Sequence, residues 1–224
     1  MRVGRESATA RSDRAATIAE HLGEVYPDSA CSLDFRSPFE LVIATILSAQ
    51  CTDKRVNMVT PDLFRRWPSP DALAHADTAE VEAVIRSTGF YRAKTKSIQG
   101  CARAIVERHG GEVPATLDAL VRLPGVGRKT ANVVMGTAFG LASGVVVDTH
   151  VGRISRRLGM TRQNDAVRAE RDLNRVVPRE HWISWSHRLI DHGRGVCTAR
   201  APRCDACLLA DLCPRIGVAP SRRR

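Results

Sequence analysis

One lysine near the middle of the chain has the setting of a catalytic amine. Lys129 lies in the stretch LVRLPGVGRKTANVV, directly after Arg128, where a second apolar helical pattern begins. In the first turn of a helix, the helix dipole and the neighbouring guanidinium both disfavour the ammonium form, so we expect the pKa of Lys129 to be lowered. Only four of the 34 basic residues are lysines, at 54, 94, 96 and 129. Arginine cannot deprotonate and so cannot act as a nucleophile. The use of lysine at 129 therefore predicts a nucleophile, and the alternative is a cation that contacts phosphate.

The turn before Lys129 has the composition of a phosphate-binding hairpin. A helix is predicted to end near Leu123, and the next to begin at about Arg128. Between them, Gly125 and Gly127 are expected to adopt positive φ and to let backbone amides approach an anion closely. The following helix adds N–H groups and the positive end of its dipole. Such a hairpin contacts DNA backbone phosphates without reading sequence, and the alternative is an ordinary turn between packed helices.

A carboxylate follows in VVVDTHVGRISRRLG. Asp148 comes directly before a predicted helix, and an aspartate there commonly caps the helix amides. A carboxylate held by amides stays ionised, so it could also stabilise positive charge at a deoxyribose C1′ or assist Lys129. His150 is a candidate phosphate ligand, with simple packing as the alternative.

Four cysteines near the end of the chain have the spacing of a metal site. Cys197, Cys204, Cys207 and Cys213 are separated by six, two and five residues. Four thiolates this close predict a tetrahedral soft site, either structural zinc or an iron–sulfur cluster. Zinc fingers usually pair two CxxC units, and the single unit here favours iron–sulfur. We expect a structural role that positions the basic loop containing Arg200 and Arg203.

The elements that must position these groups are predicted to be helices. Apolar residues recur at three- and four-residue spacing, and no alternating strand pattern of useful length competes. The segments are FELVIATILSAQ, VEAVIRS, KSIQGCARAIVERHGG, TLDALVRL, KTANVVMGTAFG, VGRISRRLG and HWISWSHRLIDHG. The 224 residues, 43% hydrophobic, suffice for an all-α protein of one compact unit or two small lobes. A formal charge of +10 indicates a partner that carries phosphates.

Composition also predicts the compartment. No stretch approaches 18 apolar residues and no apolar secretory core follows the first residues, so we expect a cytoplasmic protein with no membrane partner. Residues 1–14 and the terminal SRRR are predicted to be basic ends without fixed structure. In a reducing compartment the remaining cysteines are expected to be buried small hydrophobes. These are Cys31, Cys51 and Cys101, of which Cys51 could also lie near DNA.

Taken together, these motifs resemble endonuclease III, the iron–sulfur member of the helix-hairpin-helix DNA glycosylases. The resemblance runs from roughly Ile18 to Cys213 and is carried by SPFELVIATILSAQCTD, LPGVGRKTANVV, VDTH and the cysteine spacing. It implies a six-helix barrel domain at 31–141, with the helix-hairpin-helix at about 115–140. It implies an iron–sulfur cluster domain formed by 1–30 plus 142–224, and DNA bound between the two.

The resemblance also implies a reaction and its residues. Lys129 would attack C1′ of an oxidised pyrimidine nucleotide flipped out of duplex DNA, with Asp148 as the essential carboxylate. The resulting Schiff base would let β-elimination cut the strand 3′ to the abasic site. The four cysteines would hold a 4Fe-4S cluster. Gln50 and Phe90 would fill the gap left by the flipped base, although the family more often has an aliphatic residue in place of Phe90. The implied protein is a monomer associated with the nucleoid, acting on damaged or abasic duplex DNA.

Two alternatives stay open at this point. Adenine glycosylases that act at oxidised-guanine mismatches belong to the same superfamily, but they generally lack the hairpin lysine that Lys129 supplies. A non-catalytic DNA-binding module with a zinc clip is the second alternative, and it predicts a colourless protein that does not cleave DNA.

Overall fold

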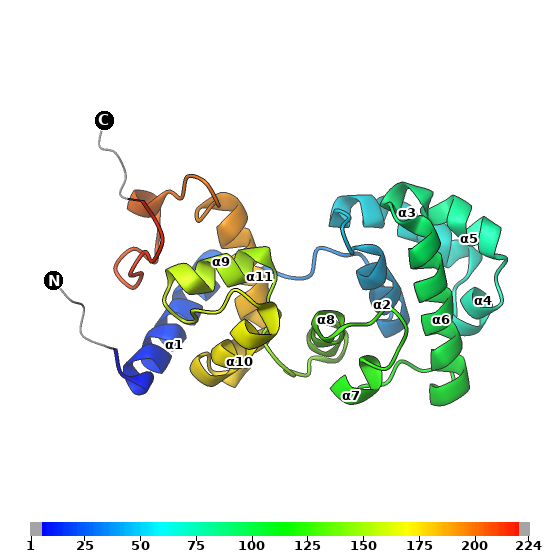
Figure 1. Ribbon diagram of the computed structural model, residues 1–224, viewed down its shortest axis with the longest axis horizontal. Coiled ribbons are helices and arrows are strands. Elements are labelled where there is room, and N and C mark those ends of the chain that lie inside the picture. The colour runs from blue at the N-terminus through cyan, green and yellow to red at the C-terminus, as the bar shows by residue number, and fades with distance from the viewer. Residues whose placement is uncertain (1–5, 220–224) are drawn as a thin grey trace. The chain divides into compact units, whose positions relative to one another are not determined.

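The computed structural model describes residues 6–219, which divide into two compact units (Figure 1). One unit is continuous, Cys31–Ser143. The other combines the segment that ends at Ala30 with the segment that begins at Gly144. Every regular element among the described residues is a helix, so the predicted all-α class is confirmed.

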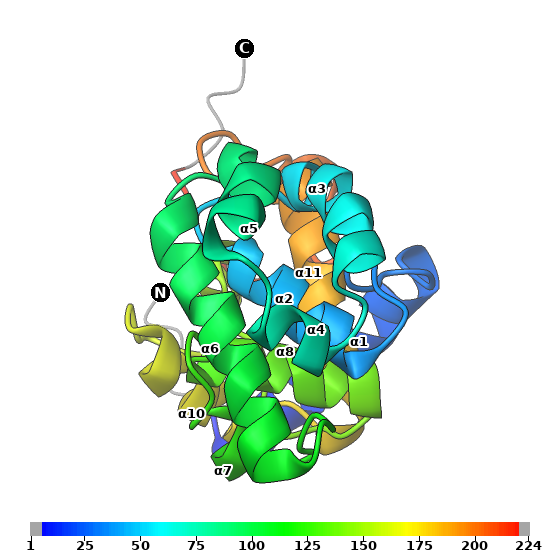
Figure 2. The ribbon, with the colours of Figure 1, turned by 90° about the vertical axis from the view of Figure 1, so that its right-hand side faces the viewer.

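The continuous unit is built around one buried helix. Its helices are α2 (Pro38–Leu47), α3 (Asp53–Arg66), α4 (Pro70–Ala74), α5 (Thr78–Ile85), η1 (Arg86–Thr88), α6 (Tyr91–His109), α7 (Leu117–Leu120) and α8 (Arg128–Phe139). Helix α2 packs against α3, α6 and α8, which surround it in Figure 2. Its residues Leu41, Val42 and Ile43 have no exposed surface. A largely apolar run, in which Glu40 and Thr45 are the polar residues, therefore forms the centre of the unit.

The starts of these helices follow from local chemistry. Side-chain oxygens at the N-cap position accept a backbone N–H three residues on, which satisfies amides that have no partner inside the helix. The capping residues are Ser37, Thr52, Ser69, Asp77 and Thr116. Pro38 and Pro70 occupy the first helical position, where a missing N–H does no harm.

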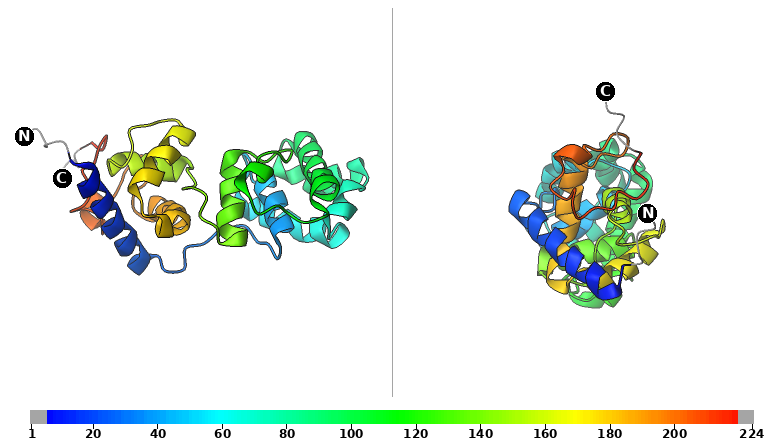
Figure 3. Two further views of the ribbon diagram at one scale, coloured as in Figure 1. Left: turned by 90° about the horizontal axis from the view of Figure 1, so that it is seen from below. Right: turned by 90° about the vertical axis from the view of Figure 1, so that its left-hand side faces the viewer.

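The discontinuous unit has its own core. It contains α1 (Ala8–Val25), α9 (Thr149–Arg157), α10 (Ala166–Val176), η2 (Arg179–His181), α11 (Trp182–Gly195) and η3 (Cys204–Ala206). Helix α1 packs on α10 and α11, and α9 packs on α11, an arrangement that Figure 3 shows from below and from the side. Trp185 of α11, 1% exposed, lies in this core with apolar residues of the other helices.

Several predictions need correction. Residues 8–14, predicted to lack structure, form the first turns of α1, and Arg14 donates to Glu6 and to the carbonyl oxygen of Leu158. Residues 1–5 and the terminal SRRR lie outside the described residues. Helix α7 ends at Leu120, earlier than predicted, and tighter turns continue the chain to Leu123.

The three scattered cysteines differ in burial. Cys101 is fully buried, and burial raises the pKa of its thiol to about 12, so it behaves as the predicted small hydrophobe. Cys31 and Cys51 are only half-buried at the edge of the same core, so full burial was wrong for these two. Among the described residues, no helix is both long and apolar enough to cross a membrane.

Candidate functional site

The predicted hairpin is present and packs tightly. It runs from α7 to α8 through Pro124 and Gly125, with the Val126 amide donating to the Leu123 carbonyl oxygen at 3.1 Å. Gly125 has φ +77°, and a β-carbon there would lie 2.8 Å from Cβ of Ser97 on α6. Only glycine satisfies both the left-handed backbone and this close approach. The hairpin is therefore fixed against α6 by its own sequence.

The second hairpin glycine has a different role from the one predicted. Gly127 has φ −85°, so the expectation of a positive φ was wrong for it. It is the N-cap of α8, and an added β-carbon would meet no atom within 4 Å. Gly127 has no side chain to cover the start of α8, which leaves the first-turn amides accessible to an anion.

Lys129 lies exposed in the first turn of α8, directly after exposed Arg128. Its side chain is thus available to a substrate that approaches the helix N-terminus. Lys54 and Lys96 are also exposed, whereas Lys94 is only 5% exposed. Among the four lysines, Lys129 is the one that follows a hairpin with anion-binding geometry. Its role as nucleophile stays a prediction.

Asp148 caps α9 in the discontinuous unit. It is half-buried, and its Oδ1 accepts the backbone N–H of Val151 at 2.7 Å. The capping function of the carboxylate is thus confirmed, and it leaves Oδ2 for other chemistry. Lys129 belongs to the other unit, Cys31–Ser143.

His150 has the surroundings of a packed residue. Its Nδ1 lies 3.2 Å from Nη2 of Arg153. A β-carbon at Gly193 of α11 would lie 2.7 Å from the same nitrogen, so glycine is required for the two helices to approach. The ring is half-buried in this contact. A phosphate contact by His150 stays a prediction.

Gln50 and Phe90 share an unusual backbone. Both are exposed and have left-handed conformations, with φ 53° and 48°. Phe90 is 68% exposed, so its ring does not pack in the core. Non-glycine residues seldom adopt this conformation, and where they do the strain commonly marks a functional position. Gln50 follows the end of α2, and Phe90 is the N-cap of α6.

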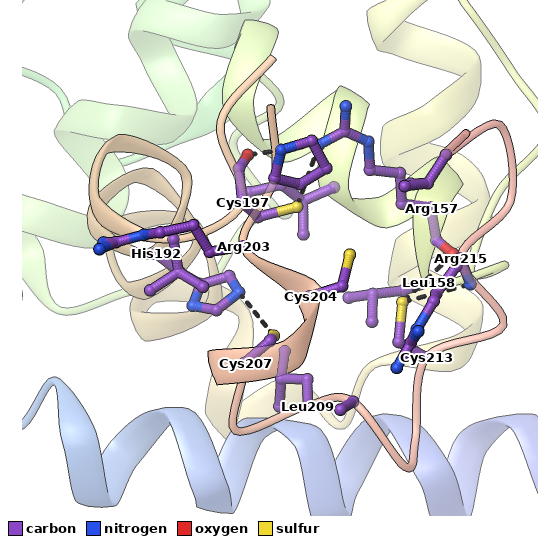
Figure 4. Close-up of a pocket in the computed structure, with 15 residues that line it drawn as sticks. Arg157, Leu158, His192, Cys197, Arg203, Cys204, Cys207, Leu209, Cys213 and Arg215 are labelled. Carbon is purple, nitrogen blue, oxygen red and sulfur yellow. Dashed lines mark hydrogen bonds between the residues drawn. The ribbon is translucent and has the colours of Figure 1, made fainter. Parts of the chain in front are cut away.

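The four C-terminal cysteines come together around one pocket. Figure 4 shows Cys197, Cys204, Cys207 and Cys213 lining it from the loop after α11, from η3 and from the segment beyond. The rest of the lining is largely apolar, including Ile154, Leu158 and Leu209. Burial raises the pKa of Cys207, and the three other cysteines raise it further. Burial also raises the pKa of Cys213, and a bound metal group would favour the thiolate forms that act as ligands.

The donor set of the pocket fits an iron–sulfur cluster. All four side chains supply sulfur, the soft ligand that iron–sulfur clusters and zinc share. The four sulfurs line one pocket, which is what a shared metal group requires. The donor set is therefore consistent with the predicted cluster.

Two residues that the sequence analysis missed bind these cysteines. Arg157 donates from Nη1 to Sγ of Cys197 at 3.2 Å and to the Thr198 carbonyl oxygen at 2.8 Å. His192 is 1% exposed, and its Nε2 lies 3.5 Å from Sγ of Cys207. Hydrogen bonds to cluster sulfurs tune such sites. A signal for Arg157 existed, since it shares the apolar face of α9 with Ile154 and Leu158.

The predicted basic loop lies on the surface. Arg200 and Arg203 are both exposed, between the first and second cysteines. Arg203 is anchored at both ends, because its N–H donates to the Val196 carbonyl oxygen at 3.0 Å and its guanidinium donates to that of Gly195. The loop thus has a defined backbone, and its contact with DNA stays a prediction.

Comparison with known proteins gives two family matches. Residues 43–179 match the HhH-GPD superfamily of base excision DNA repair proteins. Residues 197–213 match the iron-sulfur binding domain of endonuclease III, which supports the cluster assignment and contradicts a zinc clip. The first match covers the hairpin, Lys129 and Asp148, and the second covers the four cysteines.

Comparisons with individual relatives support the same family assignment. Endonuclease III of Synechocystis sp. is 54% identical over 204 residues, which cover 91% of this chain and 93% of that protein. The structure of a non-covalent endonuclease III–DNA complex superposes with a TM-score of 0.84 at 43% identity, over 91% of this chain and 95% of that one. A trapped endonuclease III–DNA covalent intermediate, an estranged-adenine complex, gives a TM-score of 0.84 at 42% identity, over 91% and 96%. With the hairpin, the cluster pocket and the fold all in place, this chain belongs to the endonuclease III family of helix-hairpin-helix base excision repair proteins.

Proposed function

We propose that the protein is a bifunctional DNA glycosylase and abasic-site lyase of base excision repair. It removes oxidised pyrimidines from duplex DNA and cleaves the strand 3′ to the abasic site through a Schiff base on Lys129. The observation that carries the proposal is an exposed lysine in the first turn of the helix that follows a glycine-shaped hairpin. A trapped covalent intermediate with DNA in a relative of 42% identity supports a covalent path.

The reaction requires the Lys129 amine in its neutral form. Its nitrogen lone pair attacks C1′. The bond from C1′ to the base breaks, its electron pair leaves with the base, and the base then takes up a proton. Opening of the sugar ring gives a protonated Schiff base between Nζ and C1′. This positive group makes the C2′ proton acidic, and its removal expels the 3′ phosphate. Hydrolysis of the Schiff base then frees the lysine.

Asp148 supplies the negative charge that this path needs. Positive charge develops at C1′ as the base departs, and a carboxylate stabilises it most effectively where its position is already fixed. The Val151 amide fixes one oxygen of Asp148 at 2.7 Å. We propose that the second oxygen faces the reacting sugar.

Base extrusion is the step before chemistry. The hairpin amides and Arg128 would hold a backbone phosphate near the extruded nucleotide, and His150, Arg200 and Arg203 would add phosphate contacts. Gln50 and Phe90 would occupy the gap in the base stack. A damaged base stacks poorly and costs less to extrude, which favours lesions over normal bases.

The cysteine pocket has a structural task in this scheme. A bound 4Fe-4S cluster supplies a rigid crosslink among the four cysteines. The protein contributes the ligands, the apolar surround and the Arg157 hydrogen bonds that hold the segment after Cys197. We propose that Cys31–Ser143 is the six-helix barrel domain, and that the segments ending at Ala30 and beginning at Gly144 form the cluster domain.

The partner and compartment complete the proposal. The protein binds DNA, as the family complex does. We propose that the bound form is duplex DNA with a damaged base or an abasic site, that the protein acts as a monomer, and that it works in the cytoplasm on the nucleoid. A net charge of +10 supports a polyanionic partner.

A lesion panel tests this function. Purified protein is incubated with duplexes that contain thymine glycol, an abasic site, or oxidised guanine opposite adenine. We expect excision of thymine glycol and cleavage of both the thymine-glycol and the abasic strands, with a 3′ end that carries an unsaturated aldehyde. Removal of adenine without strand cleavage would instead indicate a monofunctional adenine glycosylase.

A further inference from the structure

Lys94 is a buried lysine that the catalytic scheme does not use. It lies on the core-facing side of α6 with Ile98 and Cys101 and is only 5% exposed. Burial lowers the pKa of its amine, and nearby Cys51 opposes that change. Its place in the first turn of a helix also disfavours a cation. A lysine kept at such an unfavourable position must make a contact that compensates for it.

Lys94 holds the Phe90 loop by two bonds. Its Nζ donates to the Thr88 carbonyl oxygen at 2.7 Å, and its backbone N–H donates to the Phe90 carbonyl oxygen at 3.0 Å. The two acceptors lie on either side of Gly89, which has φ +71°. Thr88 is itself 2% exposed, and its hydroxyl donates to the Ile85 carbonyl oxygen at 2.8 Å. The chain before and at Phe90 is thus tied to α6 through one residue.

The turn that carries Gln50 borders the same core. Cys51 follows Gln50 directly. Cys51 is half-buried against the same core, and its N–H donates to the Ser48 carbonyl oxygen at 3.1 Å. The turn after Gln50 and helix α6 thus pack on one core, and the hydrogen bond of the Lys94 amine reaches the segment that leads to Phe90.

We propose that Lys94 is a positioning residue for base extrusion, which holds Phe90 where its side chain fills the gap left by a flipped nucleotide. The inference rests on the proposed function. It predicts that Lys94 acts through the inserted Phe90 side chain and not on the Schiff-base chemistry at Lys129. The two roles can be separated because single-stranded DNA has no base stack, so no gap forms in it that Phe90 could fill.

The test compares two substrates. Lys94→Met removes the donors at similar length, and Lys96→Met, on the exposed side of the same helix, is the matched control. Cleavage is measured on a duplex with thymine glycol and on a single strand with a preformed abasic site. We expect Lys94→Met to lower the duplex rate about 10- to 100-fold more than the single-strand rate, because a small misplacement of a contact has effects of that size. Lys94→Gln, which keeps an N–H donor, should recover part of the loss.

A double variant separates positioning from general damage. If Lys94 acts through Phe90, Lys94→Met should add no further loss of duplex activity in a Phe90→Ala background. A 2-aminopurine base opposite the lesion should also show weaker unstacking with Lys94→Met than with wild type. Additive losses, equal losses on both substrates, or an unchanged duplex rate would overturn the inference. Should wild type cleave neither substrate, the proposed function fails first, and the inference fails with it.

Discussion

The guanidinium of Arg157 binds the sulfur of Cys197, with Nη1 3.2 Å from Sγ. The same side chain donates to the carbonyl oxygens of Thr198 and Ala199, both at 2.8 Å, and is only 9% exposed. One residue of α9 therefore orders both a cluster ligand and the chain that follows it. Such supporting contacts commonly determine how firmly a metal site is held.

Arg157→Leu should weaken the cluster without changing its four ligands. We expect about a 10- to 100-fold loss of cluster affinity, seen as faster bleaching of the visible absorbance in the presence of an iron chelator. Arg156→Leu is the control, because Arg156 lies on the same helix but donates to the Gln163 carbonyl oxygen. Equal bleaching rates in the two variants would show that Arg157 does not support the cluster.

Asp148 has a capping role and a proposed chemical role, which two substitutions separate. Asn is as good an N-cap as Asp, so Asp148→Asn should unfold at the wild-type temperature but lose activity on the order of 10²-fold. Asp148→Ala should lose the same activity and, in addition, about 1 kcal/mol of unfolding free energy. Chemical denaturation and single-turnover rates provide both readouts. If Asp148→Asn kept wild-type activity, the carboxylate would have no chemical role and would serve only as the N-cap of α9.

The two hairpin glycines should respond differently to alanine. Gly125→Ala places a β-carbon 2.8 Å from Ser97 at φ +77°, so we expect a loss of about 1–3 kcal/mol in unfolding free energy. Gly127→Ala meets open space at φ −85°, but alanine is a poorer N-cap than glycine, so it should cost no more than about 1 kcal/mol. Thermal or urea unfolding measures both. If the two variants had equal unfolding free energies, the close packing of the hairpin on α6 would be refuted.

Phe90 should contribute to activity and not to stability. Its side chain is 68% exposed and its backbone is left-handed, a conformation that asparagine tolerates better. Phe90→Asn should therefore leave the unfolding free energy unchanged or raise it by about 1 kcal/mol, while excision from duplex DNA falls. Phe90→Leu should retain excision because it keeps an apolar side chain. If Phe90→Asn instead lost much unfolding free energy, the Phe90 ring would contribute to packing of the fold.

The parts that sequence predicted best are those with strong local rules. Periodic apolar residues located α2, α6 and α8, and glycine chemistry located the turn at Gly125. The predicted segments did not include α1, α3, α4 or α10. In α3 and α10, charged residues obscure the apolar pattern, namely Arg65 and Arg66 in α3 and four arginines or glutamates in α10. Pro61 also lies inside α3. Such helices are stabilised by packing of one narrow face, which is a tertiary effect.

In the candidate site, too, the sequence predicted what depends on local spacing and missed what depends on helix packing. Cysteine spacing predicted four ligands, and all four line one pocket. Spacing could not reveal that His192 and Arg157 approach them from two helices, since both contacts depend on how α9 and α11 pack. The scarcity of lysine drew attention to Lys129, yet it applied equally to Lys94. Only the structure shows that the first is exposed and the second buried.

The central claim is a covalent bond between Lys129 and DNA, and borohydride trapping tests it most directly. Sodium borohydride reduces a Schiff base to a stable amine, so wild type mixed with abasic duplex DNA should yield a crosslinked band. Mass spectrometry should place the attached sugar on Lys129. Lys129→Gln should abolish the band, while Lys54→Gln and Lys96→Gln should retain it. An adduct that survives Lys129→Gln, or none with wild type, would contradict the account.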